Sequence, residues 1–318
     1  MSYSGEGTQQ NPFVLGASAT CSDYFTLVTT QLGAYIKLET DLDFSTDPQY
    51  REGVTDVWFY VCAKVYADTK PGGGKYYING FKNTSNCPIL NQGSQTLTFE
   101  NIQLTNWVFN KASDQAYFIY GNSYPIIFNN CDISLYMNCV NYNKSLSYGS
   151  GTDEFNDCSL YIIIAGSYEG TSQNPPILGS VCTFTNCCIQ IDGLTYCGYP
   201  NAVNPNGDFC NLTRCTLLVD MQLPKLAEIG QDYPYYLCLS NITNSCLALT
   251  IHNGPLNTGG YKIIEHISFY NLVAPTTIID TSILDTNVVQ PTAETNLVPL
   301  TTAQMKNQTK LLEIGFLL

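Results

Sequence analysis

One pattern of apolar and small residues recurs in this chain at intervals of about 27 to 30 residues. In each copy an apolar residue is followed three, five and, in most copies, seven positions later by another apolar or small residue. The copies begin at Phe99, Phe128, Phe155, Phe184, Leu212, Ile242 and Phe269. Such a period is typical of stacked-repeat proteins, in which each repeat packs on its neighbours.

Within a copy, apolar and polar residues alternate as a half-buried β-strand requires. Cys131, Ile133 and Leu135 show this alternation in the second copy. The interval exceeds what short strands and tight turns need, so we expect one loop to project from each coil. The sequence therefore predicts an all-β fold, a right-handed parallel β-helix (solenoid) with coils of about 27 to 30 residues, irregular N-terminal coils and a short C-terminal helix.

Two positions of the repeat carry a distinctive residue type. The third position is asparagine in five of seven copies, namely Asn101, Asn130, Asn186, Asn244 and Asn271, and it is Asp157 or Arg214 in the other two. Asparagine can satisfy backbone groups at a bend, so this column predicts a structural ladder of side-chain amides. The fourth position is cysteine in four copies, Cys131, Cys158, Cys187 and Cys215, which predicts a structural stack of small buried thiols.

The ends of the chain differ from the repeat, and three regions are predicted. Residues 1–90 form an N-terminal cap and the first irregular coils, with strands expected within 34–44, 57–67 and 72–81. Residues 91–284 hold the β-helix repeats. Residues 285–318 form a linker and a C-terminal capping helix, for which Thr301 and Gln304 fit a capping box.

Charge and hydropathy argue against several partners. The chain has 13 Lys and Arg against 26 Asp and Glu, a net charge of −13, whereas binding to a phosphate backbone needs clustered cations. We therefore expect no nucleic-acid partner. The sequence shows neither a signal peptide nor an apolar run of about 18 residues, so we expect no membrane partner. The 14 cysteines are expected to be reduced, because a secretion signal is not apparent.

No catalytic residue, metal or cofactor is predicted. Asp132, Glu154 and Asp157 lie at or beside repeat positions on neighbouring coils and could form a glycosidase-like carboxylate pair, but we interpret them as surface or turn residues. The densest cysteine cluster contains Cys182, Cys187, Cys188 and Cys197, whose spacing matches the strand period better than a zinc site. Asp41 and Asp43 could bind Ca²⁺ or be solvated.

Tyrosines gather in the expected loops. Tyr148, Tyr168, Tyr199 and Tyr235 are the candidates for surface contact. Aromatic rings among small polar residues suit recognition of sugars or proteins. The alternative is that these rings pack over the sides of the coils.

Both ends of the chain resemble a known family. GTQQNPFVL from Gly7 with YIKLETDLDF from Tyr35, and LTTAQMKN from Leu300 with LLEIGF, are similar to the opening and closing segments of pectin-lyase-like right-handed β-helix proteins of tailed bacteriophages. The resemblance implies a virion structural protein, a capsid decoration or a head or tail appendage. Its implied partners are other virion proteins, its own copies, with a trimer favoured, and a host-surface glycan. The absence of a recognisable catalytic constellation favours a non-enzymatic role, and the absence of an apparent secretion signal favours assembly in the host cytoplasm.

Two alternatives of a different class stay open. The first is an appendage enzyme, a depolymerase that cleaves a host-surface polysaccharide with converging carboxylates. The second is an adhesin that binds a glycan without cleaving it. Affinity without cleavage distinguishes the second from the first.

Overall fold

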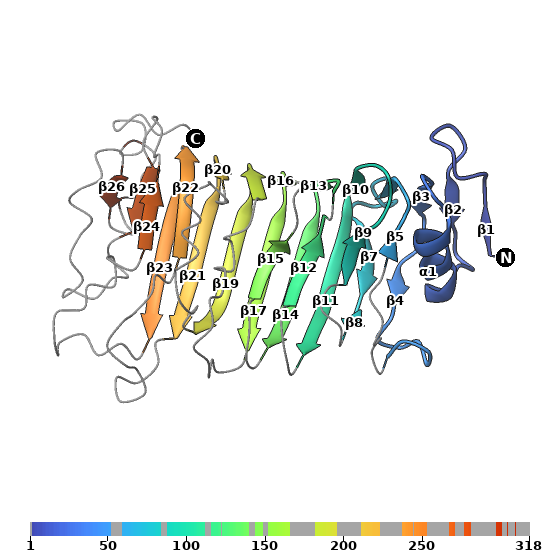
Figure 1. Ribbon diagram of the computed structural model, residues 1–318, viewed down its shortest axis with the longest axis horizontal. Helices are drawn as coiled ribbons and strands as arrows, with labels where there is room; N and C mark the ends of the chain where they lie inside the picture. Colours follow the sequence, from blue (N-terminus) through green and yellow to red (C-terminus); the bar gives the residue numbers. More distant parts are fainter. Residues whose placement is uncertain are drawn as a thin grey trace.

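The protein folds as a parallel β-helix, so the fold class predicted from the repeat is confirmed (Figure 1). The computed structural model describes residues 2–51, 59–83, 88–111, 116–121, 123–139, 144–148, 152–165, 182–195, 211–222, 237–243, 245–252, 267–270, 277–280, 297–300, 304 and 309. Strands from successive coils lie side by side along the long axis, with helix α1 (Cys21–Thr30) at the N-terminal end.

The strands form three sheets, named here A, B and C. Sheet A contains, in spatial order, β1 (Tyr3–Ser4), β2 (Phe13–Leu15), β3 (Tyr35–Leu38), β6 (Lys64–Ala67), β10 (Leu97–Glu100), β13 (Ile126–Asn129), β16 (Asp153–Asn156), β18 (Cys182–Thr185), β20 (Asn211–Thr213), β22 (Leu237–Thr243) and β24 (Ile267–Tyr270). Sheet B contains β4 (Leu42–Asp43), β7 (Tyr76–Asn79), β11 (Ile102–Lys111), β14 (Asp132–Cys139), β17 (Ser159–Ala165), β19 (Cys188–Thr195), β21 (Thr216–Gln222), β23 (Cys246–His252), β25 (Thr277–Asp280) and β26 (Leu297–Leu300), with β8 (Lys82–Asn83) beside β11. Sheet C contains β5 (Phe59–Tyr60), β9 (Ile89–Asn91), β12 (Ala116–Tyr120) and β15 (Lys144–Tyr148).

The repeat positions coincide in space because neighbouring coils pair in parallel and in register. Phe99 pairs with Phe128, Phe128 with Phe155, and Phe155 with Phe184. The four rings are fully buried, and successive centroids lie 5.0, 4.9 and 4.7 Å apart with interplanar angles of 7°, 6° and 11°. The in-register pairing of the copies thus places one aromatic column in the core.

Helix α1 was not predicted, because residues 1–90 were expected to form a cap and irregular coils without a helix. Thr20 and Asp23 form a capping box: Thr20 N–H donates to Asp23 Oδ2 at 2.9 Å, and Asp23 N–H donates to Thr20 Oγ1 at 3.2 Å. The helix buries Cys21, Tyr24, Leu27 and Val28 against the first coils. It therefore covers apolar side chains at the N-terminal end, as the terminal repeat of a solenoid requires.

Three further predictions concern the ends. The strand segments expected within 34–44, 57–67 and 72–81 contain β3 and β4, β5 and β6, and β7. Sheet A runs without a break across the predicted boundary at residue 90, because β6 pairs with β10. Of the predicted C-terminal helix, Gln304 and Thr309 have helical backbone, and the rest lies outside the described residues.

Candidate functional site

The asparagine column lies at the bend between sheets A and B. Asn101, Asn130 and Asn186 adopt φ of 53°, 50° and 55°, and Asp157 and Arg214 share this left-handed conformation at 55° and 51°. Asparagine and aspartate tolerate it better than most residues with a side chain. Asn244 and Asn271 lie outside the described residues. The column is thus a series of identical backbone bends.

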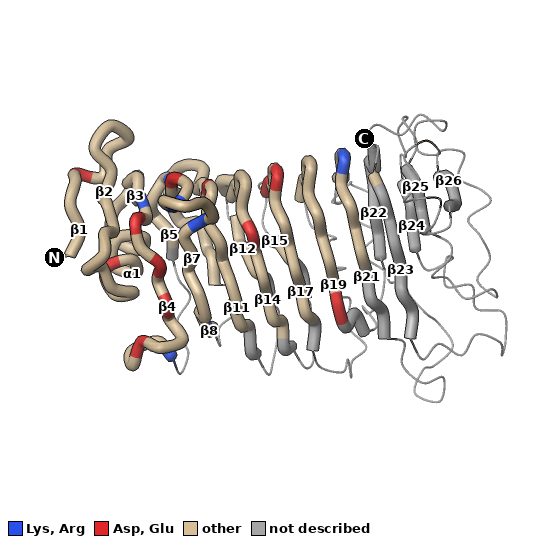
Figure 2. Tube along the Cα trace, turned by 180° about the vertical axis from the view of Figure 1, so that it is seen from behind, with Lys and Arg blue, Asp and Glu red and all other residues tan. Residues whose placement is uncertain are grey.

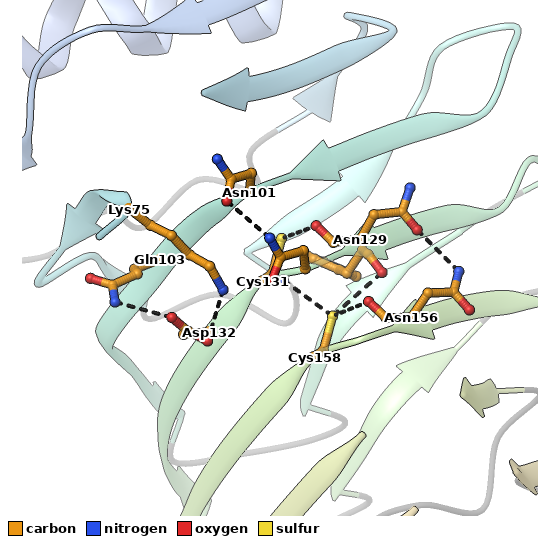
Figure 3. Close-up of polar contacts among 10 residues, drawn as sticks. Lys75, Asn101, Gln103, Asn129, Cys131, Asp132, Asn156 and Cys158 are labelled. Atoms are coloured by element: carbon orange, nitrogen blue, oxygen red, sulfur yellow. Dashed lines mark hydrogen bonds and ion pairs between the residues drawn. The ribbon is translucent and has the colours of Figure 1, made fainter. Parts of the chain in front are cut away.

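Side chains of this column bond from coil to coil, and each described donor bonds to the coil on its N-terminal side. Figure 3 shows the ladder bond at Asn101. Asn101 Nδ2 donates to the Ala67 carbonyl at 2.9 Å, and Asn130 Nδ2 donates to Asn101 Oδ1 at 3.0 Å. Asn186 Nδ2 donates to Asp157 Oδ1 at 2.9 Å, and Arg214 Nε donates to Asn186 Oδ1 at 2.6 Å. Because a carboxylate cannot donate, Asp157 starts a second run of the ladder instead of continuing the first.

We expect Asn130→Ala to lower the free energy of unfolding by about 2 kcal/mol and Asn130→Gly by less. Alanine loses the bond to Asn101 and lacks the polar side chain that lets asparagine adopt the left-handed conformation, which costs a residue with a Cβ roughly 1 to 2 kcal/mol. Glycine loses the bond but adopts this conformation without strain. Urea denaturation of the two variants measures the difference. Equal losses would show that the bend conformation contributes nothing.

The cysteine column follows the bend and points inward. Cys131, Cys158, Cys187 and Cys215 are free thiols exposed by no more than 3%. Cys131 N–H donates to Cys158 Sγ at 3.4 Å, and the Cys158 thiol donates to the Asn156 carbonyl at 3.2 Å (Figure 3). Burial raises the pKa of the Cys131 thiol well above its ordinary value. These thiols serve as small interior hydrogen-bonding groups.

Asp132, Glu154 and Asp157, from which a catalytic carboxylate pair could be drawn, have different surroundings. Asp132 accepts from Lys75 Nζ at 3.0 Å and from Gln103 Nε2 at 3.1 Å on the outer side of sheet B (Figure 3). Asp157 is exposed at the bend and accepts the ladder bond from Asn186. Glu154 alternates with the buried Asp153 and Phe155 and so faces outward from sheet A. Asp132 and Asp157 thus have structural partners.

The two aspartates considered as Ca²⁺ ligands accept hydrogen bonds from protein groups. Asp41 accepts from Lys70 Nζ at 2.7 Å and from the Tyr77 N–H at 3.1 Å. Asp43 accepts from Asn79 Nδ2 at 3.0 Å and from Ser45, and although partial burial opposes it, these hydrogen bonds lower the pKa of Asp43. Cys182 and Cys187 are buried, Cys188 is exposed on the outer side of sheet B, and Cys197 lies outside the described residues.

Two exposed tyrosines mark the outer side of sheet B. Tyr136 and Tyr161 are 37% and 39% exposed and lie on adjacent strands, β14 and β17. Tyr161 Oη donates to Asp192 Oδ2 at 2.7 Å, and Gln190 Nε2 donates to both Asp192 oxygens at 3.0 and 3.2 Å. Tyr136, Tyr161, Gln190 and Asp192 are called the tyrosine face below. It presents an oriented aromatic ring next to an amide and a carboxylate.

The tyrosine face was missed in the sequence reading, which selected loop tyrosines. Tyr148 ends strand β15, where it pairs with Tyr120, while Tyr168, Tyr199 and Tyr235 lie outside the described residues. The strand alternation was the available signal, because Tyr161 follows the inward-facing Leu160 and precedes the inward-facing Ile162. Charged residues of the described chain gather towards the N-terminal coils (Figure 2). Asp192 lies within β19.

One acidic residue of the described part of the chain is buried inside the coils. Asp153 is 0% exposed, and its Oδ1 accepts the Ile126 N–H at 2.7 Å. Its other oxygen, Oδ2, accepts from the Ser147 hydroxyl. Burial outweighs these two bonds and raises the pKa of Asp153 to about 6 from an ordinary 3.8. The sequence reading did not select Asp153, which occupies an inward position held by Leu97 and Ile126 in preceding coils.

The fold and its surface define a capped β-solenoid with ladders of stacked side chains. Comparison with models of protein families, with curated proteins and with solved structures found no match to this chain. Among the described residues, no helix has the length and apolar character needed to span a bilayer.

Proposed function

We propose that this protein is a non-enzymatic structural component of a tailed-phage virion, used as a capsid decoration or as a head or tail appendage. It is assembled in the host cytoplasm and resides in the virion. Its partners are other virion proteins and its own copies, with a trimer as the favoured oligomer. A host-surface glycan is a further partner of the exposed sides.

The observation that carries this proposal is the continuous coil-to-coil stacking. The Phe99–Phe184 column and the bend ladder tie successive coils together in register. Such stacking supports a stiff elongated element, which suits a load-bearing part of a particle. The ion pair of Asp132 and the ladder bond of Asp157 support a structural role for these carboxylates. The virion assignment itself depends on the resemblance proposed above for the segments from Gly7, Tyr35 and Leu300.

The tyrosine face favours a second candidate, a glycan-binding adhesin. The Tyr161 ring is partly exposed and its hydroxyl is fixed by Asp192. A fixed ring offers an apolar surface for the carbon-bound hydrogens of a sugar, and the adjacent amide and carboxylate can bond to sugar hydroxyls. The surface chemistry is compatible with binding, and it does not require cleavage.

One set of measurements on the purified chain separates these candidates. Light scattering coupled to size-exclusion chromatography is expected to show a stable oligomer, and incubation with host-surface polysaccharide is expected to yield no new reducing ends. Immunogold labelling of purified particles is expected to place the protein on the virion. Labelling absent from particles that contain every other structural protein would contradict the proposal.

The same samples test the tyrosine face. Glycan binding that falls at least tenfold in Tyr161→Ala, and less in Tyr161→Phe, would support the adhesin, because phenylalanine keeps the ring and loses only the bond to Asp192. Thr183→Ala, on the outer side of sheet A, is the matched control. New reducing ends that disappear in Asp132→Ala or Asp157→Ala would instead establish a depolymerase.

A further inference from the structure

Asp153 joins two coils at the corner between sheets C and A. Ser147 reaches it from β15 of the same coil, and the Ile126 N–H reaches it from β13 of the preceding coil. Gly121, just after β12, approaches so closely that a Cβ there would lie 2.7 Å from Asp153 Oδ1. Gly121, Ile126, Ser147 and Asp153 are called the corner latch below.

The side chain of Asp153 replaces an apolar residue. Its position in the coil is occupied by Leu97 and Ile126 in the two preceding coils and by Cys182 in the next. All three of those side chains are 0% exposed. A carboxyl group therefore sits in a column otherwise filled by apolar or weakly polar groups, where an ionised form is poorly solvated.

The neighbouring corner clamp has different chemistry. Asn91, 1% exposed on β9, donates through Nδ2 to the Tyr124 carbonyl at 3.2 Å and to the Gln95 carbonyl at 3.0 Å, and its Oδ1 accepts the Gly93 N–H at 3.0 Å. Asn91 thus binds the backbone two residues before Ile126, whose amide is bound by Asp153. Because an amide does not titrate, this clamp has the same charge at every pH.

We propose that the corner latch is a pH-sensitive switch: it is closed while Asp153 is neutral, and it opens to water at the corner between sheets C and A when Asp153 ionises. Opening supplies the hydration that the charged carboxylate lacks in the closed corner, at the expense of the Ile126 hydrogen bond. The raised pKa of Asp153, about 6, places the transition between mildly acidic and neutral conditions. This inference goes beyond the proposed function and does not depend on it.

Among the described residues, no charged side chain contributes to the shift in the pKa of Asp153. β13 contributes the Ile126 amide and β15 the Ser147 hydroxyl, while β18 places the buried Cys182 thiol at the in-register position. Glu154 faces outward on the same strand, and Tyr124 in the adjoining corner is 41% exposed. Burial is the largest cause of the Asp153 shift, and both hydrogen bonds oppose it.

Hydrogen exchange of the whole chain at pH 5.0 and pH 7.5, corrected for the intrinsic rate at each pH, tests the switch. The protection factor of the Ile126 amide is expected to be at least tenfold lower at pH 7.5 than at pH 5.0. The protection factor of the Phe128 amide, in the same strand, is expected to be the same at both pH values. Asp153→Asn, which stays uncharged and can donate to Ser147, is expected to show equal protection of Ile126 at both values. Glu154→Gln, the matched change on the outer side, is expected to respond like the unmodified chain.

Three results would overturn the inference. Unchanged protection of Ile126 in the unmodified chain would show that the ionised latch stays closed. An equal loss in Asp153→Asn would assign the response to another group. An equal loss at Phe128 would show that the strand opens as a whole. Circular dichroism of each variant at pH 5.0 verifies that the comparison is made on folded protein.

Discussion

Phe155→Ala is expected to lower the free energy of unfolding by about 3 to 5 kcal/mol, the range for emptying a well-packed aromatic site. Phe155 lies between Phe128 and Phe184 with centroid distances of 4.9 and 4.7 Å, so its removal breaks two stacked contacts as well as leaving a cavity. Neighbouring coils cannot close the gap without losing the register of their backbone bonds. Urea denaturation followed by far-ultraviolet circular dichroism measures the loss.

Two variants make this result specific to the column. Phe155→Leu is expected to cost less than half as much, because Leu212 occupies the equivalent position in a later coil and is fully buried there. Glu154→Ala, on the outer face of the same strand, is expected to change stability by no more than about 0.5 kcal/mol. A loss for Phe155→Ala as small as that of Glu154→Ala would show that the stack contributes little to stability.

Asp153→Asn is expected to stabilise the protein at neutral pH. The folded-state pKa of Asp153 is about 6, against 3.8 for an ordinary aspartate. Between these values the unfolded chain has released the proton while the folded chain still binds it, so stability falls as pH rises from 3.8 to 6 and then levels off. The total fall is roughly 3 kcal/mol.

Urea denaturation of both proteins between pH 3.5 and 7.5 isolates this contribution, because other titrating groups contribute equally to each curve. The two stabilities are expected to converge near the acidic end and to differ by roughly 3 kcal/mol at neutral pH, with Asp153→Asn the more stable. A constant difference across the range would show that Asp153 has the same pKa in the folded and unfolded chains. A more stable unmodified chain at neutral pH would show that its carboxylate is well solvated.

The repeat period was sufficient to predict the stacking of equivalent residues. Once the repeated strands pair in parallel, residues at the same position of the repeat lie side by side, so Phe128, Cys131 and Asn130 lie next to their counterparts. The alternation of apolar and polar residues also distinguishes inward from outward positions. The exposed tyrosines on the outer side of sheet B could have been found from that alternation alone.

Local exceptions to the repeat were harder to predict. In β11, the bend at Asn106 shifts the register between Leu104 and Trp107, so Trp107 points inward and its indole N–H donates to the Ile78 carbonyl at 2.9 Å. Helix α1 had only the weak signal of Thr20 and Asp23. Neither the register shift in β11 nor helix α1 is part of the repeat, so the repeat pattern does not predict them.

The sequence by itself determined the β-helix, the approximate period of its coils and the columns of phenylalanine, cysteine and asparagine, because the same residue pattern recurs once in each coil. Only the tertiary structure decided the surroundings of the individual polar groups. Asp153 and Asp132 are the same residue type, yet one is buried against Ser147 and the other is paired with Lys75 near the surface. The protonation of a carboxyl group depends on the solvent and partners that the fold brings to it, and these come from distant parts of the chain.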